Sequence, residues 1–245
     1  MPFTFSHPAI VLPLTYLPKR WISLTGLVVG SVVPDFEYFL RMKVLSTYSH
    51  TFKGLLWFDI PFGLLLAFLF HSLVRNSLFE NLPWILKSRL VVFETFNWNN
   101  YFTKNWIVII ISILLGAALH IFWDSFTHDH GYFVLMFSVL QEKIGLLGLQ
   151  FPISKIIQHV STLIGGSLII ISLLKFPIHN GTPHNLDLKY WILCFIIASI
   201  ILMIRISFGI DFQFYGHLIV SGMSAMLCAL VLTPLIIRIK LSLNP

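Results

Sequence analysis

The chain has 245 residues, of which 57% are hydrophobic and only 11% are charged, whereas roughly 25% of the residues in a typical soluble domain are charged. It has too few polar side chains to cover a water-facing surface, which excludes a disordered tail, a coiled coil and an ordinary cytosolic domain. The formal net charge of +6 is typical of membrane-protein loops that face the cytoplasm and anionic lipid. We therefore expect a polytopic membrane protein whose partner is the lipid bilayer, with no nucleic-acid ligand.

The N-terminal stretch MPFTFSHPAIVLPLTYLP has no basic residue before its apolar part and three prolines after position 2. We expect no cleaved signal peptide here, so the anchoring must come from internal spans. The two cysteines, Cys194 and Cys228, lie in apolar runs, where a thiol behaves as a small hydrophobic side chain. Neither a disulfide framework nor a thiolate metal site is expected.

Apolar runs long enough to cross a bilayer as helices are found at 55–74, 106–127, 157–176, 190–209 and 215–237. A sixth segment at 21–40 is interrupted by Pro34, Asp35 and Glu37, and its uninterrupted part is too short to cross alone. That segment can be tilted, re-entrant or partly buried in protein. The sequence predicts an all-α fold, a polytopic helical bundle of five to six hydrophobic spans that forms a single integral membrane domain over residues 1–245.

The motif HIFWDSFTH places His120, Asp124 and His128 at intervals of four residues, so a continuous helix would carry all three on one face. A charged group in mid-span costs on the order of 2.5 to 3.5 kcal/mol on insertion scales, so each one needs a partner. Imidazole and carboxylate are ligands of Zn²⁺ and similar metals, and this spacing lets side chains on successive turns reach one ion. The alternative is a buried hydrogen bond between helices formed by His120 and Asp124.

Further ligands are available before the first of these five runs. Asp35 follows Pro34, which tends to break a helix, so its carboxylate can project from an irregular corner into a polar cavity. His50 lies in a polar stretch before a span, and His7 precedes a proline that favours an extended backbone. Taken alone, Asp35 is more often a cap or turn residue, and the two histidines are more often exposed.

His159 begins the third long span, with Gln158 and Ser161 as polar neighbours. It can be a ligand, a donor to a ligand or an interfacial residue. The glycines of the following LIGGS motif favour close helix packing over phosphate binding, because no basic residue or strand accompanies them.

The ordered motifs FSHPAIVLPL, GSVVPDFEYF, YSHTFKGLLWFDIPFG, HIFWDSFTHDHG and QHVSTLIGG strongly resemble those of a family of bacterial membrane proteins catalogued as domain of unknown function 4184, over essentially the whole chain. That family has no established activity. More distantly, the order His, Pro-Asp, Ser-His and His-x-x-x-Asp resembles membrane-bound metal-dependent hydrolases of the LexA-regulated inner-membrane type. It is also similar to the ligand order of soluble zinc-dependent phospholipase C and single-strand nucleases, which are all-α enzymes.

The distant resemblance implies that Asp35, His50, His120 and Asp124 are metal ligands, with Asp124 placed to bridge two ions. It assigns His7 to an N-terminal ligand position. A further metal would be held by a second group of candidates, His128, His130 or His159. The chain lacks the N-terminal Trp of that pattern and the His-x-x-x-Glu pair after HIFWDSFTHDHG, so we expect one or two metal ions rather than three.

These observations lead to the hypothesis of a Zn²⁺-dependent hydrolase of the bacterial inner (cytoplasmic) membrane that cleaves a phosphoester or another ester of a lipid or lipid-linked substrate. Asp35 and Asp124 are the expected catalytic residues. The expected metal ligands are His7, Asp35, His50, His120, Asp124, His128 and His159. The alternative is a non-catalytic membrane protein with a structural metal, a buried polar network, or a pathway for metal ions or protons.

The sequence also predicts where these residues lie. Asp35, His50, His120 and Asp124 should converge in space, because the spans contain too few Lys and Arg residues to pair with two carboxylates. We expect His128 and His159 at the periphery of this group, on the same side of the membrane as His50.

Overall fold

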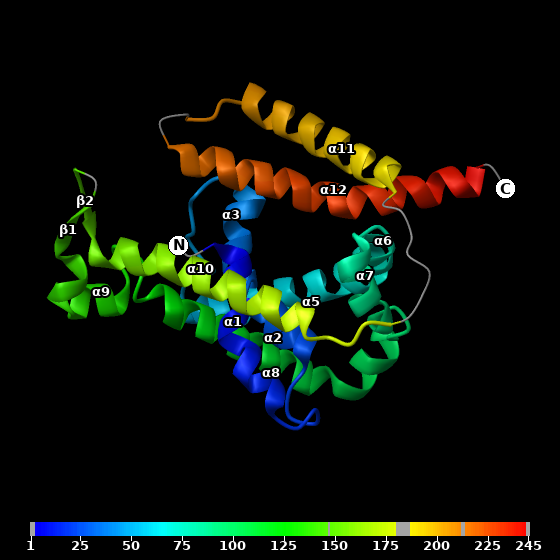
Figure 1. Ribbon diagram of the computed structural model, residues 1–245, viewed down its shortest axis with the longest axis horizontal. Coiled ribbons are helices and arrows are strands. Elements are labelled where there is room, and N and C mark those ends of the chain that lie inside the picture. The colour runs from blue at the N-terminus through cyan, green and yellow to red at the C-terminus, as the bar shows by residue number, and fades with distance from the viewer. Residues whose placement is uncertain (1–2, 147, 180–186, 212–213, 244–245) are drawn as a thin grey trace. The chain divides into compact units, whose positions relative to one another are not determined.

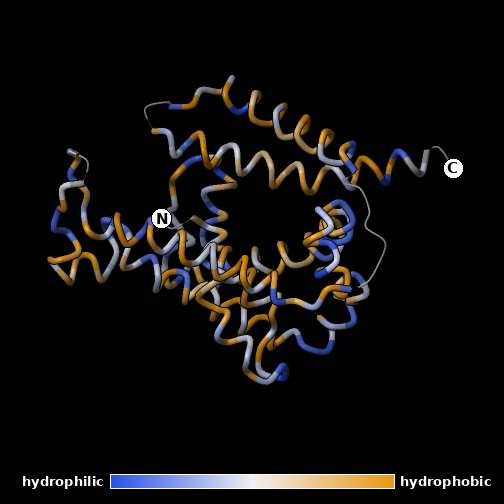
Figure 2. The backbone as a smooth tube through the Cα atoms, viewed as in Figure 1, coloured by the Kyte–Doolittle hydropathy of each residue, from blue (hydrophilic) through white to orange (hydrophobic). Residues whose placement is uncertain are grey.

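The computed structural model describes residues 3–146, 148–179, 187–211 and 214–243 (Figure 1). Nearly all of its regular structure is helical, which confirms the predicted all-α fold. One short antiparallel hairpin, β1 (Lys143–Leu146) and β2 (Leu149–Pro152), pairs Lys143 with Pro152 at its open end. Figure 2 shows that the long helices are largely hydrophobic along their length, as bilayer spans require.

The chain forms two compact units. The first unit comprises residues 1–35, 48–64 and 105–172, and the second comprises residues 36–47, 65–104 and 173–245. The expectation of a single integral membrane domain stays a prediction.

The first unit contains the N-terminal helices, the start of the first long span and most of the next two. Its elements are η1 (Thr4–Ser6), α1 (Pro8–Val11), η2 (Leu12–Tyr16), α2 (Leu24–Gly30), η3 (Val33–Asp35), α4 (Phe52–Gly54), η4 (Leu55–Asp59), α9 (Tyr132–Met136), η7 (Ser138–Gln141) and the hairpin, with the larger parts of α8 (Trp98–Asp124) and α10 (Ile153–Leu174). Helix α5 (Ile60–Leu69) begins in this unit and ends in the second.

The second unit contains the remaining helices. These are α3 (Phe36–Arg41), η5 (Phe70–Val74), α6 (Arg75–Glu80), α7 (Trp84–Leu90), η6 (Val91–Phe93), α11 (Leu188–Ser207) and α12 (Tyr215–Leu243). Helices α11 and α12 pack through small side chains, with Cys194, Ala198, Ala225 and Ala229 buried together. Small residues let two backbones approach closely in a membrane, where packing rather than water exclusion joins helices.

Within the described residues, five helices are long and apolar enough to cross a membrane. They are Phe52–Glu80, Trp98–Asp124, Ile153–Leu174, Leu188–Ser207 and Tyr215–Lys240, and each overlaps one of the five predicted apolar runs. The first is continuous from α4 to α6 but contains two π-helical turns, η4 and η5. The structure therefore supports an integral membrane protein.

The segment at 21–40 is not a sixth span. It forms two short helices, α2 and α3, separated by the 3-10 turn η3 at Pro34. Ser23 caps the first of them, since its hydroxyl accepts a hydrogen bond from the Gly26 backbone N–H at 3.3 Å. The break at Pro34 gives the next residue, Asp35, an irregular backbone position, as the sequence predicts.

Glycines allow α2 to pack directly on α8. A Cβ atom at Gly30 would lie 2.8 Å from Ile113 Cα, and one at Gly116 would lie 2.7 Å from the Ser31 nitrogen. Both distances are shorter than side chains tolerate, so larger residues would push the helices apart. Ile113 and Leu27 are fully buried beside this contact. The contact fixes the position of the Ser31 backbone, whose carbonyl group belongs to the candidate site described below.

The N-terminal segment packs in a similar way on α10. The Ser6 hydroxyl donates to the Thr162 carbonyl at 3.0 Å, and the Phe3 backbone N–H donates to the Thr162 hydroxyl at 3.0 Å. A Cβ atom at Gly165 would lie 2.8 Å from the Ser6 carbonyl oxygen. The prediction that the LIGGS glycines serve close packing is confirmed at Gly165.

The glycine contact between α2 and α8 leads to a stability prediction. Gly116→Ala should destabilise the protein by about 1–3 kcal/mol, the usual range for overpacking a well-packed interior. Gly222→Ala is the matched control, because a Cβ at Gly222 meets nothing within 4 Å and alanine favours a helix. Thermal unfolding in detergent measures both. An equal unfolding midpoint for the two variants would contradict the close packing of α2 on α8.

Candidate metal centre

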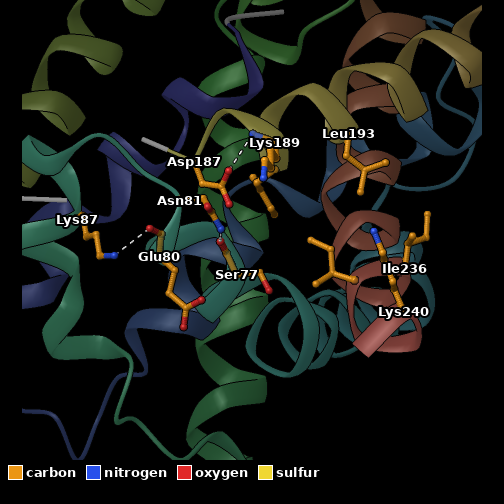
Figure 3. Close-up of a pocket in the computed structure, with 11 residues that line it drawn as sticks. Ser77, Glu80, Asn81, Lys87, Asp187, Lys189, Leu193, Ile236 and Lys240 are labelled. Carbon is orange, nitrogen blue, oxygen red and sulfur yellow. Dashed lines mark hydrogen bonds between the residues drawn. The ribbon is translucent and has the colours of Figure 1, made fainter. Parts of the chain in front are cut away.

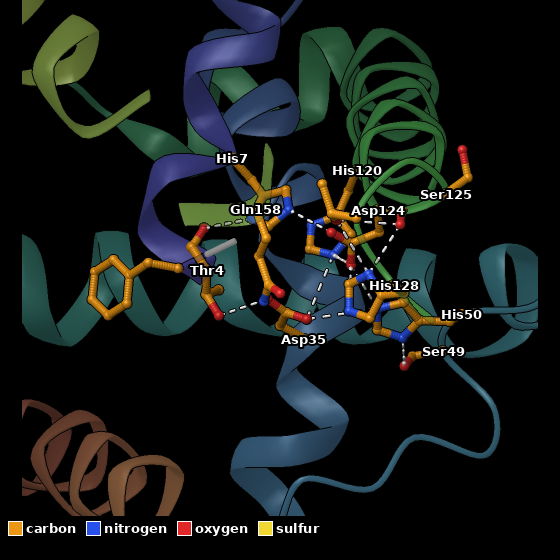
Figure 4. A network of polar contacts seen from close by, with 12 residues as sticks. Thr4, His7, Asp35, Ser49, His50, His120, Asp124, Ser125, His128 and Gln158 are labelled. Atoms are coloured by element: carbon orange, nitrogen blue, oxygen red, sulfur yellow. Dashed lines mark hydrogen bonds and ion pairs between the residues drawn. The ribbon is translucent and has the colours of Figure 1, made fainter. Parts of the chain in front are cut away.

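Four ionisable side chains of the first unit meet at one point (Figure 4). His120 and Asp124 lie one turn apart at the C-terminal end of α8, which places them on the same face of the helix. Asp35 ends η3, and His50 lies in the turn just before α4. The predicted convergence of the four residues is confirmed.

The facing atoms of this group are two imidazole nitrogens and two carboxylate oxygens. His120 Nε2 lies 3.5 Å from Asp35 Oδ1 and 3.3 Å from Asp124 Oδ2. His50 Nε2 lies 3.6 Å from each of the same two oxygens. All four ligand atoms lie within 4.8 Å of one another. Since N–H···O hydrogen bonds measure about 2.7–3.2 Å, the four atoms surround a common point rather than forming close pairs.

This spacing fits a divalent metal ion. Zn²⁺ binds imidazole nitrogen at about 2.0–2.1 Å and carboxylate oxygen at about 2.0–2.2 Å, usually with tetrahedral geometry. Ligand atoms at the corners of such a tetrahedron are separated by about 3.3–3.6 Å. The four nitrogen–oxygen separations of 3.3 to 3.6 Å match this value. The donor set and its geometry therefore suit Zn²⁺.

The charge of the group also requires a cation. Asp35 is fully buried and Asp124 is 4% exposed. Burial alone would raise the pKa of Asp35, but the positive charge of His120 and the imidazoles of His120 and His50 facing its carboxylate hold that pKa well below its usual range. Burial lowers the pKa of His50, yet the carboxylates of Asp124 and Asp35 outweigh it and raise this pKa. An ionised carboxylate in this interior needs a positive charge beside it, either an imidazolium or a metal ion.

A threonine or serine group holds three of the four side chains from behind. His120 Nδ1 donates to the Ser31 carbonyl at 2.7 Å, which leaves Nε2 facing the centre. The Thr4 hydroxyl donates to Asp35 Oδ2 at 2.6 Å, which leaves Oδ1 facing the centre. His50 Nδ1 contacts the Ser49 hydroxyl at 3.0 Å. Such partners fix the tautomer and orientation of metal ligands.

His7 lies behind Asp124, outside the group of four. Its Nε2 contacts Asp124 Oδ1 at 3.1 Å, and its Nδ1 donates to the Thr4 carbonyl at 3.2 Å. Its ring stacks on that of His120, with centroids 3.8 Å apart. His7 is fully buried, so the expectation of an exposed N-terminal histidine is wrong. It fixes the carboxylate that His120 and His50 share.

The predicted single helical face of HIFWDSFTH is wrong at its third member. Helix α8 ends at Asp124, and His128 lies in the turn that follows. The chain nevertheless folds back, because His128 Nδ1 donates to the Asp124 carbonyl at 3.0 Å. His128 Nε2 is thereby 3.7 Å from Asp124 Oδ2, at the edge of the group, and its side chain is 28% exposed.

His159 is exposed on α10, whereas the neighbouring Gln158 is buried. Figure 4 shows the Gln158 side chain pointing toward Asp35. Sequence reasoning treated Gln158 only as polar company for His159 and did not find Thr4, Ser31 or Ser49. The presence of a glutamine in an apolar span is a signal in the sequence that could have pointed to Gln158 as part of the site. The Ser31 contact uses a backbone carbonyl, which no side-chain pattern reveals.

Comparison with known proteins identifies the family of the chain. The family described as Domain of unknown function (DUF4184) matches residues 1–235. No curated protein and no solved structure matches the chain. The match covers every residue of the candidate centre.

If the centre holds a metal ion, its removal should destabilise the fold, because two buried carboxylates would lose a compensating charge. We expect a strong chelator to lower the thermal unfolding midpoint of the parent, and Zn²⁺ to restore it. The chelator should have little effect on an Asp35→Asn/Asp124→Asn variant. Asp187→Asn is the control, since Asp187 is exposed and caps α11, a role asparagine also fills. A parent insensitive to the chelator would contradict a stabilising metal.

The Thr4 hydroxyl offers a second test of the centre. Thr4→Val removes the hydrogen bond to Asp35 while preserving side-chain shape, so metal affinity should fall about 10- to 100-fold, as for other partners of metal ligands. Thr4→Ser keeps the hydroxyl and should restore most of the affinity. Competition with a fluorescent zinc chelator measures both values. Equal affinity for the valine variant and the parent would show that Thr4 does not orient the ligand.

Proposed function

We propose that this chain, which belongs to the family described as Domain of unknown function (DUF4184), is a metal-dependent hydrolase that cleaves an ester of a lipid or lipid-linked molecule. The proposed cofactor is one Zn²⁺ or two divalent ions. The observation that carries the proposal is the set of four facing donor atoms of Asp35, His50, His120 and Asp124, whose nitrogen–oxygen separations are 3.3 to 3.6 Å.

Accessibility supports a reaction at this site. Asp35 and His120 are fully buried, but the His50 and His128 side chains are 20% and 28% exposed. The group is thus closed behind His120 and open beside His50 and His128. A bound divalent ion would supply Lewis-acid activation of water and stabilisation of charge on the ester oxygen. In the proposed reaction, water and substrate would approach from the side of these two partly exposed histidines.

The residues have separate roles in this proposal. Asp35 and Asp124 hold the cation with His50 and His120, while His7 and Thr4 keep the two carboxylates in place. His128, at the open edge, can contact a second ion or orient the phosphate of a substrate. We assign no contact at the centre to His159, which is exposed on α10.

The position of the centre along the spans supports a lipid substrate. His50 lies two residues before the span Phe52–Glu80, and Asp124 is the last residue of the span Trp98–Asp124. The centre therefore lies where these spans end, at the depth of lipid headgroups and ester linkages. In a phosphodiester, water oxygen would bond to phosphorus, the bond to the leaving oxygen would break, and that oxygen would take a proton. The proposal extends to the bacterial cytoplasmic membrane on the basis of the motif resemblance to inner-membrane hydrolases.

One observation favours a second function, a structural metal site. Four protein ligands would fill a tetrahedral shell, whereas catalytic zinc sites usually keep one position open. In that case the ion would join η3, the turn before α4 and the end of α8 without reacting. Metal content is the same in both cases, so turnover separates them.

The test combines metal analysis with an ester assay on the purified protein in detergent. We expect about one or two zinc ions per chain in the parent, and metal-dependent cleavage of bis(p-nitrophenyl) phosphate and a fluorescent phospholipid. His120→Ala and Asp124→Ala should lose the metal and at least about a hundredfold in turnover, more than the roughly 10- to 100-fold that loss of a hydrogen-bonding partner of a ligand causes. His159→Ala is the control and should match the parent.

The outcomes are distinct. Bound zinc without turnover of either ester would identify a structural site. A parent without bound metal after loading with Zn²⁺ would leave a buried polar network. Loss of metal in His159→Ala would contradict the ligand set described above.

A further inference from the structure

A cavity of the second unit is lined by none of the residues of the candidate metal centre (Figure 3). Its volume is about 700 Å³, within the 300–1,000 Å³ typical of small-molecule sites. It is lined by the end of α6, the start of α7, the first turns of α11 and the last part of α12. All of these residues belong to the second unit.

The lining is amphipathic. Lys87, Lys189 and Lys240 contribute three ammonium groups, against the two carboxylates of Glu80 and Asp187. The apolar part includes Leu193 and Ile236, which Figure 3 shows on the opposite side from Glu80, Asn81 and Asp187. A cavity with more positive than negative side chains and with an apolar wall suits an anionic amphiphile better than a free ion.

Among the residues that the structure describes, the charged side chains that line the cavity do not form ion pairs with one another. Lys87 Nζ donates to the Glu80 backbone carbonyl at 3.0 Å, and Asp187 Oδ1 accepts from the Lys189 backbone N–H at 2.9 Å. In the part of the chain that the structure describes, no hydrogen bond or ion pair involves the ammonium groups of Lys189 and Lys240. Both side chains are exposed, so they are available to an anion.

A buried hydroxyl gives an independent indication of a ligand. Tyr190 lines the cavity and is only 2% exposed, yet its hydroxyl has no hydrogen-bond partner among the described residues. A buried polar group without a partner destabilises a folded protein. A ligand oxygen that reached this hydroxyl from the cavity would supply the missing partner.

The cavity also lies at a membrane boundary. It collects the end of the span Phe52–Glu80, the start of Leu188–Ser207 and the end of Tyr215–Lys240. Because successive spans alternate in direction, these three ends lie on the same face of the membrane. Headgroup phosphates are concentrated at that depth, and lysines near span ends attract them.

We propose that this cavity binds the headgroup of an anionic phospholipid that carries hydroxyl groups, such as phosphatidylglycerol. Lys189 and Lys240 contact the phosphate, Glu80 and Asp187 accept hydrogen bonds from the glycerol hydroxyls, and the Tyr190 hydroxyl donates to a headgroup oxygen. Leu193 and Ile236 cover the start of the acyl chains. This site goes beyond the proposed hydrolase function and does not depend on it.

Native mass spectrometry of the detergent-purified chain tests the proposal with phosphatidylglycerol and phosphatidylcholine of identical acyl chains. The parent should bind phosphatidylglycerol about tenfold more tightly, the effect of one or two hydrogen bonds to a charged group. Lys189→Gln/Lys240→Gln should abolish this preference, and Tyr190→Phe should reduce it. Lys104→Gln is the matched control, because Lys104 is also exposed near a span end of the second unit but does not line the cavity.

Two results would overturn the proposal. One is a phosphatidylglycerol preference that survives in the double variant when its thermal midpoint equals that of the parent. The other is displacement of the lipid by inorganic phosphate at equal concentration, which would identify a free-phosphate site. Zinc content should be the same in all of these variants. A negative result for the lipid site would therefore say nothing against the proposed metal centre.

Discussion

Two buried carboxylates determine how the first unit is built. Transfer of an isolated ionised carboxylate from water to a protein interior is unfavourable by several kcal/mol, and Asp35 and Asp124 are buried within one group. Each has one oxygen satisfied from behind, by the Thr4 hydroxyl or the His7 ring. Their other oxygens face His50 and His120. The N-terminal residues, η3 and the end of α8 must therefore lie together for the unit to fold, and their meeting point could hold a cation.

Close backbone packing supplies the precision that this group requires. Gly30 and Gly116 bring α2 against α8, and the same contact presents the Ser31 carbonyl to His120 Nδ1. Gly165 brings α10 against Ser6, next to His7 in the chain. These glycines bind nothing themselves. Because they set the distance between backbones, they determine where the imidazoles and carboxylates point.

Local patterns predicted the parts of the structure that depend on one segment at a time. Hydropathy located the five long helices, the spacing of His120 and Asp124 placed both on one face, and Pro34 marked the irregular position of Asp35. The sequence did not reveal that α8 ends before His128. The four-residue spacing continues to His128, although this residue lies in a turn and its ring donates a hydrogen bond to the Asp124 carbonyl. The partners Thr4 and Ser31 were missed for another reason. Contacts between segments depend on tertiary packing, which a single sequence does not encode as a spacing.

The position of the candidate metal centre at the ends of two spans accounts for its residue types. His50 precedes the first span and Asp124 ends the second, so the group lies at a boundary where the desolvation of a carboxylate is less severe than at the bilayer midplane. His50 and His128 connect the buried residues to the exposed surface. A phospholipid presents its phosphodiester and ester groups at that same depth while its acyl chains stay in the hydrocarbon. In the proposed reaction, a substrate of this kind would reach the centre without leaving the membrane, whereas a soluble ester would gain nothing from spans that place the ligands there.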